Sequence, residues 1–265
     1  MKKHLGMIAL LCAMILSAEK ALASTPNFTN VTSSQFTSIM NDFSAYSSYT
    51  SVSGASGRGS VFGFEVGLIA GLTSTPNVNS VAQQTDPSAS VSMIPNASIL
   101  AAISIPMGLS FELVFLPSNT FDGVSYQQYG GAVQYKLLSL PFNLAAKAHY
   151  TKTDFNFGEN LSGVNTTVSV DNKLFGADLI ASMGLLVIEP YLGVGYETAS
   201  ASMGVTGTNS IFSSAFTTSE SASASPSSAR VFIGADINLL LLTIGAEYLH
   251  AYGTSRYNLK LSAGF

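Results

Sequence analysis

The stretch that decides the fold is Tyr257-Asn-Leu-Lys-Leu-Ser-Ala-Gly-Phe265. Apolar side chains occupy every second position of it, and polar or small residues fill the positions between. Successive side chains of a β-strand point to opposite faces, so one face of this strand is apolar and the other polar. The alternation predicts a membrane-barrel strand with lipid on one side and a polar interior on the other.

The same alternation recurs along the chain and predicts about ten strands. Their ranges are 58–72, 97–105, 109–117, 126–138, 142–153, 170–182, 186–200, 228–239, 241–252 and 255–265. An even number is typical of single-chain bacterial barrels. The expected fold is an all-β, transmembrane, up-and-down antiparallel barrel of about ten strands, with eight or twelve as alternatives.

The connections between these strands alternate in length. Short links near 106–108, 139–141, 183–185 and 240 alternate with long ones at 73–96, 118–125, 154–169 and 201–227. Only the last link on the long side, 253–254, is tight. Short periplasmic turns and longer extracellular loops are typical of outer-membrane barrels. The alternative, an edge strand of a soluble β-protein, does not account for this pattern.

Charged side chains fall on one parity of the predicted strands, as where Glu112 lies between outward Phe111 and Leu113. A charge on the lipid face near the midplane costs about 2–4 kcal/mol, so the charged parity is expected to line the lumen. The lumen-lining residues predicted in this way are Glu65, Glu112, Lys136, Lys147, His149, Asp178, Glu189, Arg230, Asp236, Glu247, Arg256 and Lys260.

The first residues have the pattern of a secretory signal peptide. Lys2 and Lys3 precede an apolar stretch at 5–16, and Ala21 and Ala23 form the small-residue pattern of a signal-peptidase site. We expect cleavage after Ala23, so that residues 1–23 are removed on the way to the bacterial outer membrane. The single cysteine of the chain, at position 12, would be removed with them.

Residues 31–50 carry apolar side chains at helical spacing, which predicts a short amphipathic helix before the first strand. These side chains are Phe36, Ile39, Met40, Phe43 and Tyr46. Residues 24–57 are therefore expected to form a plug in the lumen or over its periplasmic mouth, or else a mobile leader or a helix on the membrane surface. The Ser- and Gly-rich stretch at 51–57 would be its hinge. The barrel is expected to occupy residues 58–265.

Composition excludes several classes of function. Removal of Lys2, Lys3, Lys20 and Glu19 leaves 8 of the 11 basic and 14 of the 15 acidic residues, a net charge of about −6, which argues against nucleic acid as a partner. Mean hydropathy is +0.35 and only 10% of residues are charged, yet no segment after the signal peptide resembles a membrane helix. A chain this apolar without long apolar runs is expected to spread its lipid-facing surface over alternating strands.

No pattern in the sequence predicts a catalytic, metal or cofactor site. The two histidines after the signal peptide, His149 and His250, stand in His149-Tyr-Thr and His250-Ala-Tyr, so the His-x-Ser arrangement of one type of lipid A esterase is missing twice. Outer-membrane proteases of ten strands pair a rim histidine with aspartates, and His250 has no acidic residue two positions away. We expect no enzymatic activity, no metal and no cofactor.

The mixed charges of the predicted lumen allow two interpretations. Ion pairs across the lumen could seal and stiffen the barrel, because isolated charges in a confined site need partners. Alternatively, opposed charges could line a hydrated path in which inward glycines leave room for a solute. These glycines are at positions 63, 67, 71, 130, 176, 193, 195, 234 and 245.

The final strand resembles the signal that the Gram-negative barrel-assembly machinery recognises, through Tyr257, Leu259, Leu261 and Phe265. With the signal peptide, the helical N-terminal segment and the hairpin from Ile105-Pro-Met-Gly108 to Phe115-Leu-Pro117, the chain resembles an uncharacterised family of Gram-negative outer-membrane β-barrels. In plan it is distantly similar to small hydrophobic-solute channels and fatty-acid transporter-type barrels. The latter have more strands and a longer hatch, so their binding residues cannot be transferred.

This resemblance implies passive passage of small solutes, hydrophobic or amphipathic ones among them, through a barrel gated by its N-terminal segment. The alternative is a closed barrel that serves as an anchor or surface-interaction protein, with its long loops as the working surface. The expected partners are outer-membrane lipids and lipopolysaccharide, the barrel-assembly machinery and a small solute.

Overall fold

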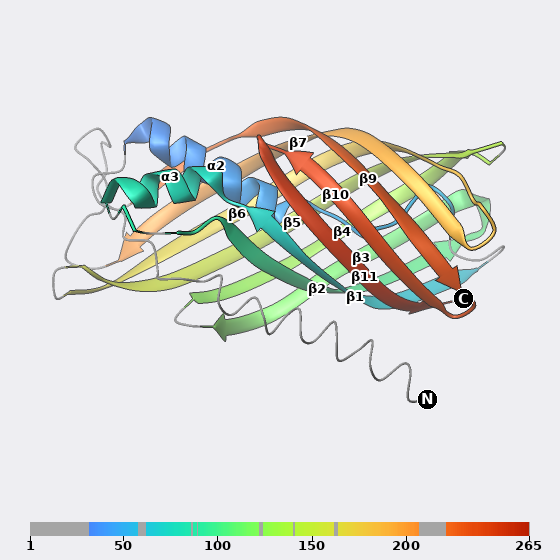
Figure 1. Ribbon diagram of the computed structural model, residues 1–265, viewed down its shortest axis with the longest axis horizontal. Helices are drawn as coiled ribbons and strands as arrows, with labels where there is room; N and C mark the ends of the chain where they lie inside the picture. The colour runs from blue at the N-terminus through green and yellow to red at the C-terminus, as the bar shows by residue number, and fades with distance from the viewer. Residues whose placement is uncertain are drawn as a thin grey trace.

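The computed structural model describes residues 32–57, 62–85, 87–88, 90–121, 124–139, 141–161, 164–206 and 221–264 (Figure 1). The expected signal peptide, its cleavage site at Ala23, the start of the N-terminal segment, most of the Ser-rich connection at 201–227 and the terminal Phe265 lie outside these residues.

Ten long antiparallel strands form a closed barrel in chain order. They are β1 (Gly63–Ser74), β2 (Met93–Ile105), β3 (Leu109–Phe121), β4 (Val124–Leu138), β5 (Asn143–Leu161), β6 (Val164–Ser182), β7 (Ile188–Thr206), β9 (Ser227–Leu239), β10 (Leu242–Ala251) and β11 (Thr254–Gly264). Pairing of β1 with β11 closes the sheet. A short extra strand, β8 (Ser221–Ala224), pairs with β7 beyond the point where β9 leaves it. The predicted up-and-down barrel is therefore confirmed.

The two ends of the barrel differ. At the turn end, the connections are the 3₁₀ turn η2 (Pro106–Gly108) and the links at 139–142, 183–187 and 240–241, and β11 also finishes there. The opposite end, which we name the loop end, carries the long connection at 75–92 between β1 and β2, and both α-helices of the described residues lie there (Figure 1). The predicted short links are thus confirmed.

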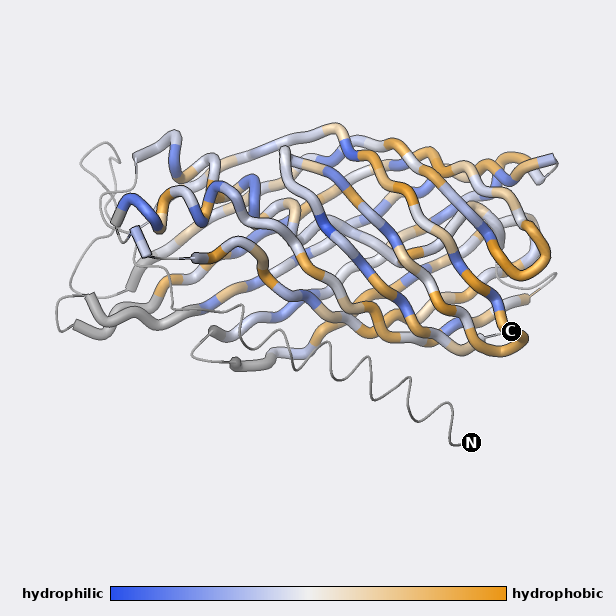
Figure 2. The backbone as a smooth tube through the Cα atoms, in the orientation of Figure 1, coloured by the Kyte–Doolittle hydropathy of each residue, from blue (hydrophilic) through white to orange (hydrophobic). Residues whose placement is uncertain are grey.

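Two predicted loops are wrong. Residues 118–121 and 124–125 continue the ladder of β3 with β4, and residues 154–161 and 164–169 continue the ladder of β5 with β6. Residues 122–123 and 162–163 lie outside the described part of the chain. The apolar alternation that marks a strand in the sequence arises from contact with lipid, and hydropathy falls toward the loop end (Figure 2). The backbone hydrogen bonds continue where that signal stops.

The predicted helix is present as α2 (Ser33–Ser47). Thr32 begins it with a capping box, in which Gln35 N–H donates to Thr32 Oγ1 and Thr32 N–H donates to the Gln35 side chain. A second helix, α3 (Pro76–Thr85), lies in the connection between β1 and β2, where we expected only a loop. Among the described residues, no helix is long and apolar enough to cross a membrane.

Helix α2 lies at the loop end, although β1 begins at the turn end (Figure 1). The expectation of a helix over the periplasmic mouth, where the short turns would lie, is therefore wrong. The helix packs beside α3 and against inward-facing residues of β5, β6 and β7. Residues 48–57, which we name the lumen segment, lead from the helix back through the barrel toward β1.

Candidate functional site in the barrel lumen

The predicted lumen-lining residues share the inner face of the barrel. All of them are buried except Lys136, which is half-buried near the turn end, where β4 has an irregular register against β5. Glu197, on the same parity, is buried with them. Of the predicted assembly strand, Tyr257 and Leu259 are exposed on the outer face and Leu261 is partly exposed there.

The lumen segment fills the space between these side chains. Its residues Ser48, Tyr49, Ser51 and Val52 are almost fully buried although no strand pairs with them. The segment has no helix or strand of its own and bends at Ala55 and Ser56, and the φ of Val52, 48°, lies in the left-handed region. The Ser- and Gly-rich stretch expected to be a hinge is thus a buried part of the interior.

Hydroxyl groups of the lumen segment donate to carboxylates of the wall. Ser48 Oγ lies 2.7 Å from Glu197 Oε1, Thr50 Oγ1 lies 2.6 Å from Glu247 Oε1, and Tyr49 OH lies 3.1 Å from Glu112 Oε2. Nearer the turn end, Ser56 Oγ donates to Glu189. A buried carboxylate needs such donors, because burial without partners costs several kcal/mol, roughly.

Oxygen atoms of the same segment accept hydrogen bonds from cations of the wall. Lys147 Nζ lies 2.9 Å from Ser51 Oγ, and Lys260 Nζ lies 2.9 Å from Ser53 Oγ. Arg230 donates to the backbone carbonyl of Tyr49 at 2.8 Å. The segment therefore supplies donors and acceptors in turn, as the alternating charges of the wall require.

The wall also pairs its own charges. Lys147 lies 2.9 Å from Glu112, and Lys260 lies 3.1 Å from Glu65 and 3.2 Å from Asp236. These pairs join strands that are neighbours or next neighbours, so they run around the wall. Ion pairs across the lumen, one of the two interpretations of the sequence, are not what these residues form. The lumen segment occupies the centre between them.

His149 stands in the most crowded part of the wall. Its Nε2 lies 3.2 Å from Arg230 Nη1 and 3.4 Å from Asp178 Oδ2, and Arg230 also pairs with Glu197. The imidazole ring stacks on the ring of Tyr49 with centroids 5.4 Å apart. The isolated histidine of the sequence is thus a contact point between the wall and the lumen segment.

Three inward glycines, on β6, β7 and β9, do not leave room for a solute. A Cβ added at Gly193 would collide with the ring of Phe232, one at Gly234 with the Tyr191 ring, and one at Gly176 with His149. Large side chains of neighbouring strands cover these glycines. Beside Tyr49 and Arg230 there remains a cavity of only ≈ 10 Å³, about the space for one water molecule.

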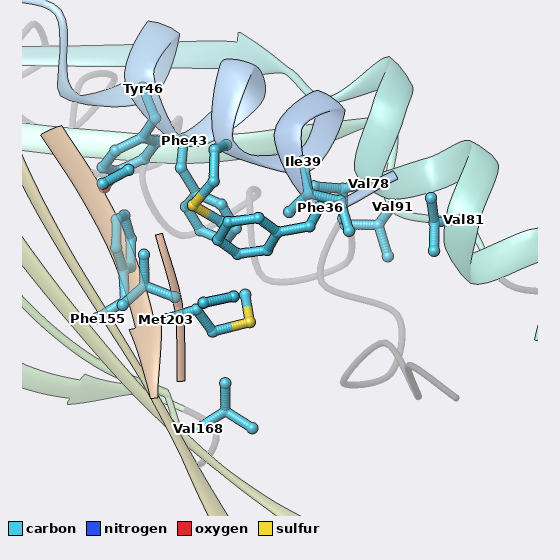
Figure 3. Packing of buried hydrophobic residues seen from close by; sticks show 14 residues of the cluster. Phe36, Ile39, Phe43, Tyr46, Val78, Val81, Val91, Phe155, Val168 and Met203 are labelled. Atoms are coloured by element: carbon cyan, nitrogen blue, oxygen red, sulfur yellow. The ribbon is translucent and has the colours of Figure 1, made fainter. Parts of the chain in front are cut away.

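The loop-end part of the lumen is apolar. Inward side chains of β4 to β7 form what we name the loop-end chamber, and the predicted apolar face of α2, Phe36, Ile39, Met40, Phe43 and Tyr46, fills it (Figure 3). The chamber is lined by Tyr126, Phe155, Val168, Val170, Ala201 and Met203. The rings of Phe43 and Tyr46 each lie 5.0 Å from the ring of Phe155, in edge-to-face geometry.

Asp42, also on α2, is a buried residue that sequence analysis missed. Its carboxylate accepts hydrogen bonds of 2.8 Å from the backbone N–H groups of Asn77 and Val78, and one of 3.1 Å from Thr254 Oγ1. Burial raises the pKa of Asp42 from its ordinary value, although these hydrogen bonds act in the opposite direction. The sequence does not reveal this role of Asp42, because the backbone groups that donate to it belong to α3, which was not predicted.

Elsewhere the described residues offer little chemistry. His250 lies near the loop end, where its Nδ1 is 3.4 Å from Ser255 Oγ. The described part of the chain contains no group of three or more His, Cys, Asp or Glu residues that could hold a metal ion. The lumen, with the segment that fills it, is therefore the candidate functional site.

Comparison with solved structures finds outer-membrane barrels. The translocator domain of the autotransporter NalP from Neisseria meningitidis is 9% identical, with 77% of this chain and 87% of that chain covered and a TM-score of 0.46. The outer membrane protease OmpT from Escherichia coli is 11% identical, with 81% and 98% covered and a TM-score of 0.43. The N-terminal β-barrel domain of Pseudomonas aeruginosa OprF is 10% identical, with 79% and 100% covered and a TM-score of 0.33.

Identities this low concern the fold alone. No curated protein matches the chain. Residues 25–265 match the family of unknown function DUF6588, and the chain belongs to that family.

Proposed function

We propose that this protein is an outer-membrane barrel for the passage of small solutes, closed at rest by its own lumen segment. The turn end faces the periplasm and the loop end faces outward. Passage requires that the lumen segment and α2 withdraw from the barrel. The observation that carries the proposal is the replaceable, mainly polar contact between the lumen segment and a wall that already pairs most of its own charges.

The outer surface supports a membrane location. Large apolar side chains are exposed in the turn-end half, among them Leu113, which is 64% exposed, and Ile233, which is 60% exposed. Figure 2 shows that hydrophobic residues concentrate in this half of the barrel. Exposure of so much apolar surface to water is costly, and a soluble monomer rarely shows such a patch. Toward the loop end the outer face carries Lys152, Asp154 and Asp171, which pair with one another and would lie beyond the lipid.

The polar contacts of the lumen segment are of a kind that water can replace. Many of them have a carboxylate or a cation of the wall as partner, and a hydrogen bond to a charged group contributes about 1.5–3 kcal/mol. Tyr49 and Val52 also pack against apolar side chains of the wall, Ile69 and Leu100 among them. The pairs of Lys147 with Glu112 and of Lys260 with Asp236 remain in the wall when the segment leaves. Val52, β-branched at a positive φ, also stores strain of roughly 1–3 kcal/mol in the closed state.

The apolar face of α2 holds the closed state in place. Burial of one large apolar side chain contributes about 1.5–3 kcal/mol, and several of them fill the loop-end chamber. Opening therefore needs a compensating interaction, which a solute that enters the chamber would supply.

A second function is favoured by one observation, the hydrogen bonds between Asp42 and the first turn of α3. They tie α2 to the connection between β1 and β2, which suits a permanently closed barrel whose loop end binds a partner. The two functions make opposite predictions for the flow of ions through the barrel.

Single-channel conductance in planar bilayers tests the proposal. The refolded chain without its signal peptide should conduct rarely, and the same chain without residues 24–57 should conduct steadily. Insertion of both forms is confirmed by protease protection. No current from the shortened chain would contradict the proposal and favour the closed barrel.

A reversible crosslink is the matched control for that deletion. Gln35 Nε2 of α2 donates to Gln84 Oε1 of α3 at 2.6 Å, and Gln84 is exposed while Gln35 is partly exposed. Cysteines at these two positions, joined by a short reducible bis-thiol reagent, should abolish the rare openings. Reduction should restore them in the same bilayer.

A further inference from the structure

Arg256 differs from the other buried cations of the lumen. Its side chain is 3% exposed, and none of the described carboxylates lies within ion-pair distance of it, whereas Lys147, Arg230 and Lys260 each have such a partner. Its Nε donates to Asn258 Oδ1 at 2.8 Å and its Nη2 to Asn96 Oδ1 at 3.3 Å. The wall thus provides this guanidinium with neutral acceptors only.

The remaining partners of Arg256 belong to the part of the chain that would withdraw. Nη1 donates to the backbone carbonyl of Tyr46 at 2.9 Å and to that of Ser48 at 2.6 Å. These carbonyls present partial negative charge where a full negative charge would bind more strongly. When α2 and the lumen segment leave, Arg256 loses both carbonyl acceptors and keeps only the neutral amide oxygens of Asn96 and Asn258 as direct partners, which is unfavourable for a buried cation.

Arg256 also lies where the two parts of the lumen meet. Tyr46 is the last side chain of α2 in the apolar cluster, and Ser48 is the first residue of the lumen segment to bind a wall carboxylate. On one side of the guanidinium is therefore the loop-end chamber, lined by Phe155, Val168 and Met203. On the other side the wall is charged.

We propose that Arg256 anchors a binding site for an organic anion with an apolar tail. The anionic group takes the place of the carbonyls of Tyr46 and Ser48, and the tail takes the place of the α2 side chains in the loop-end chamber. This inference rests on the proposed function, and it names the class of solute that would compensate for withdrawal of α2.

The charge and the shape of the site both restrict the ligand. Glu247, on the neighbouring strand, is joined to Arg256 only through Asn258. It keeps its hydrogen bonds from Tyr191 and Asn258 when Thr50 leaves, so the position vacated beside the guanidinium takes a single anionic group. A small inorganic anion would satisfy Arg256 but leave the chamber unfilled. An uncharged apolar compound would fill the chamber but leave Arg256 without a partner.

A tryptophan reporter tests the proposal, because the chain contains no tryptophan. In the Phe43→Trp variant, refolded in lipid vesicles, the reporter lies in the loop-end chamber and its emission should shift when α2 leaves. Decanoate should produce this shift at a concentration at least tenfold lower than decanol, which has the same tail without the charge. Acetate, which has the charge without the tail, should produce none.

Variants of the anchor decide the outcome. Arg256→Gln in the reporter chain should abolish the preference for decanoate over decanol, and Arg256→Lys should retain part of it. Lys260→Gln, which alters an already paired cation on the same face of β11, should leave the preference intact. Equal potency of decanoate and decanol in the reporter chain, or an unchanged preference in both Arg256 variants, would overturn the proposal.

Failure of this inference is distinct from failure of the proposed function. If the chain without residues 24–57 conducts but decanoate has no advantage over decanol, the barrel is gated and Arg256 is not its anion site. If that chain does not conduct, the proposed function itself is wrong.

Discussion

Asp42 of α2 caps the first turn of α3 by accepting a 2.8 Å hydrogen bond from the backbone N–H of Val78. A residue of one helix thus satisfies the N-terminal donors of another, 36 positions later in the chain. A negative charge at this place is also favourable to the helix dipole. The closed state of the lumen depends on this contact, because it joins the helix that fills the chamber to the loop above it.

Asp42→Ala should loosen α2. Loss of an N-cap costs about 0.5–2 kcal/mol, and the cost should appear as faster hydrogen exchange in residues 33–47 and 76–85. The control Thr254→Val removes only the 3.1 Å hydrogen bond from β11 and should have a smaller effect. Identical exchange in Asp42→Ala and the parent chain would show that apolar packing alone holds the helix.

Leu113→Arg should prevent folding into lipid vesicles. Leu113 faces outward in the apolar half of the barrel, where a buried arginine costs about 2–4 kcal/mol. Ser200→Arg places the same side chain on the outer face of β7 toward the loop end and should fold normally. The folded fraction is measured by the heat-modifiable shift in gel mobility, and equal loss in both variants would contradict the assignment of the lipid-facing half.

Gly193→Ala should destabilise the barrel, because the new methyl group meets the ring of Phe232 on the paired strand. Overpacking of this kind costs about 1–3 kcal/mol. In a Phe232→Ala background the same substitution should cost little, which a double-mutant cycle of urea unfolding in vesicles would measure. An additive cycle would mean that the glycine is needed for its backbone and not for the ring above it.

Leu240→Asn should stabilise the fold. Leu240 occupies a two-residue turn with a φ of 55°, a conformation that costs a leucine about 1 kcal/mol more than an asparagine. Its neighbour Leu241 is also exposed but lies outside the left-handed region, so Leu241→Asn is the matched control. Unfolding midpoints in urea should rise for the first variant only.

Barrel architecture could be predicted because lipid imposes a period of two on every strand that crosses it. The faces of β3 and β11 followed from where Glu112 and Lys260 fall, since a charge is excluded from the lipid side. The same reasoning could not find the outer parts of β5 and β6. Beyond the lipid the outer face turns polar, whereas the inner face carries apolar side chains such as Phe155 and Val168. The lipid-facing alternation is therefore lost there, and only the backbone ladder continues.

Sequence spacing predicted α2 and its apolar face but not its place. The place depends on contacts with Phe155 and Met203, more than a hundred residues away in the chain. Helix α3 was missed because the sequence Pro76-Asn-Val-Asn-Ser-Val has a weak apolar stripe, and its cap is supplied from outside by Asp42. The inward glycines were misinterpreted because a glycine in a sequence does not show whether a neighbour's ring lies over it.

With ten strands, the barrel begins and ends on the same side of the membrane. This chain, however, crosses the lumen once more before the first strand begins. The described ends, Thr32 and Gly264, therefore lie on opposite sides of the barrel. A segment that lies in the lumen when β1 and β11 pair is enclosed directly, so the simplest order of assembly has these two strands zip together around it. Later entry is the threading step that closure of an opened barrel would need. Labels attached at Thr32 and at Gly264 would then be accessible from opposite sides of the membrane. The time at which the Thr32 label becomes accessible from the loop-end side would give the time at which the barrel closes.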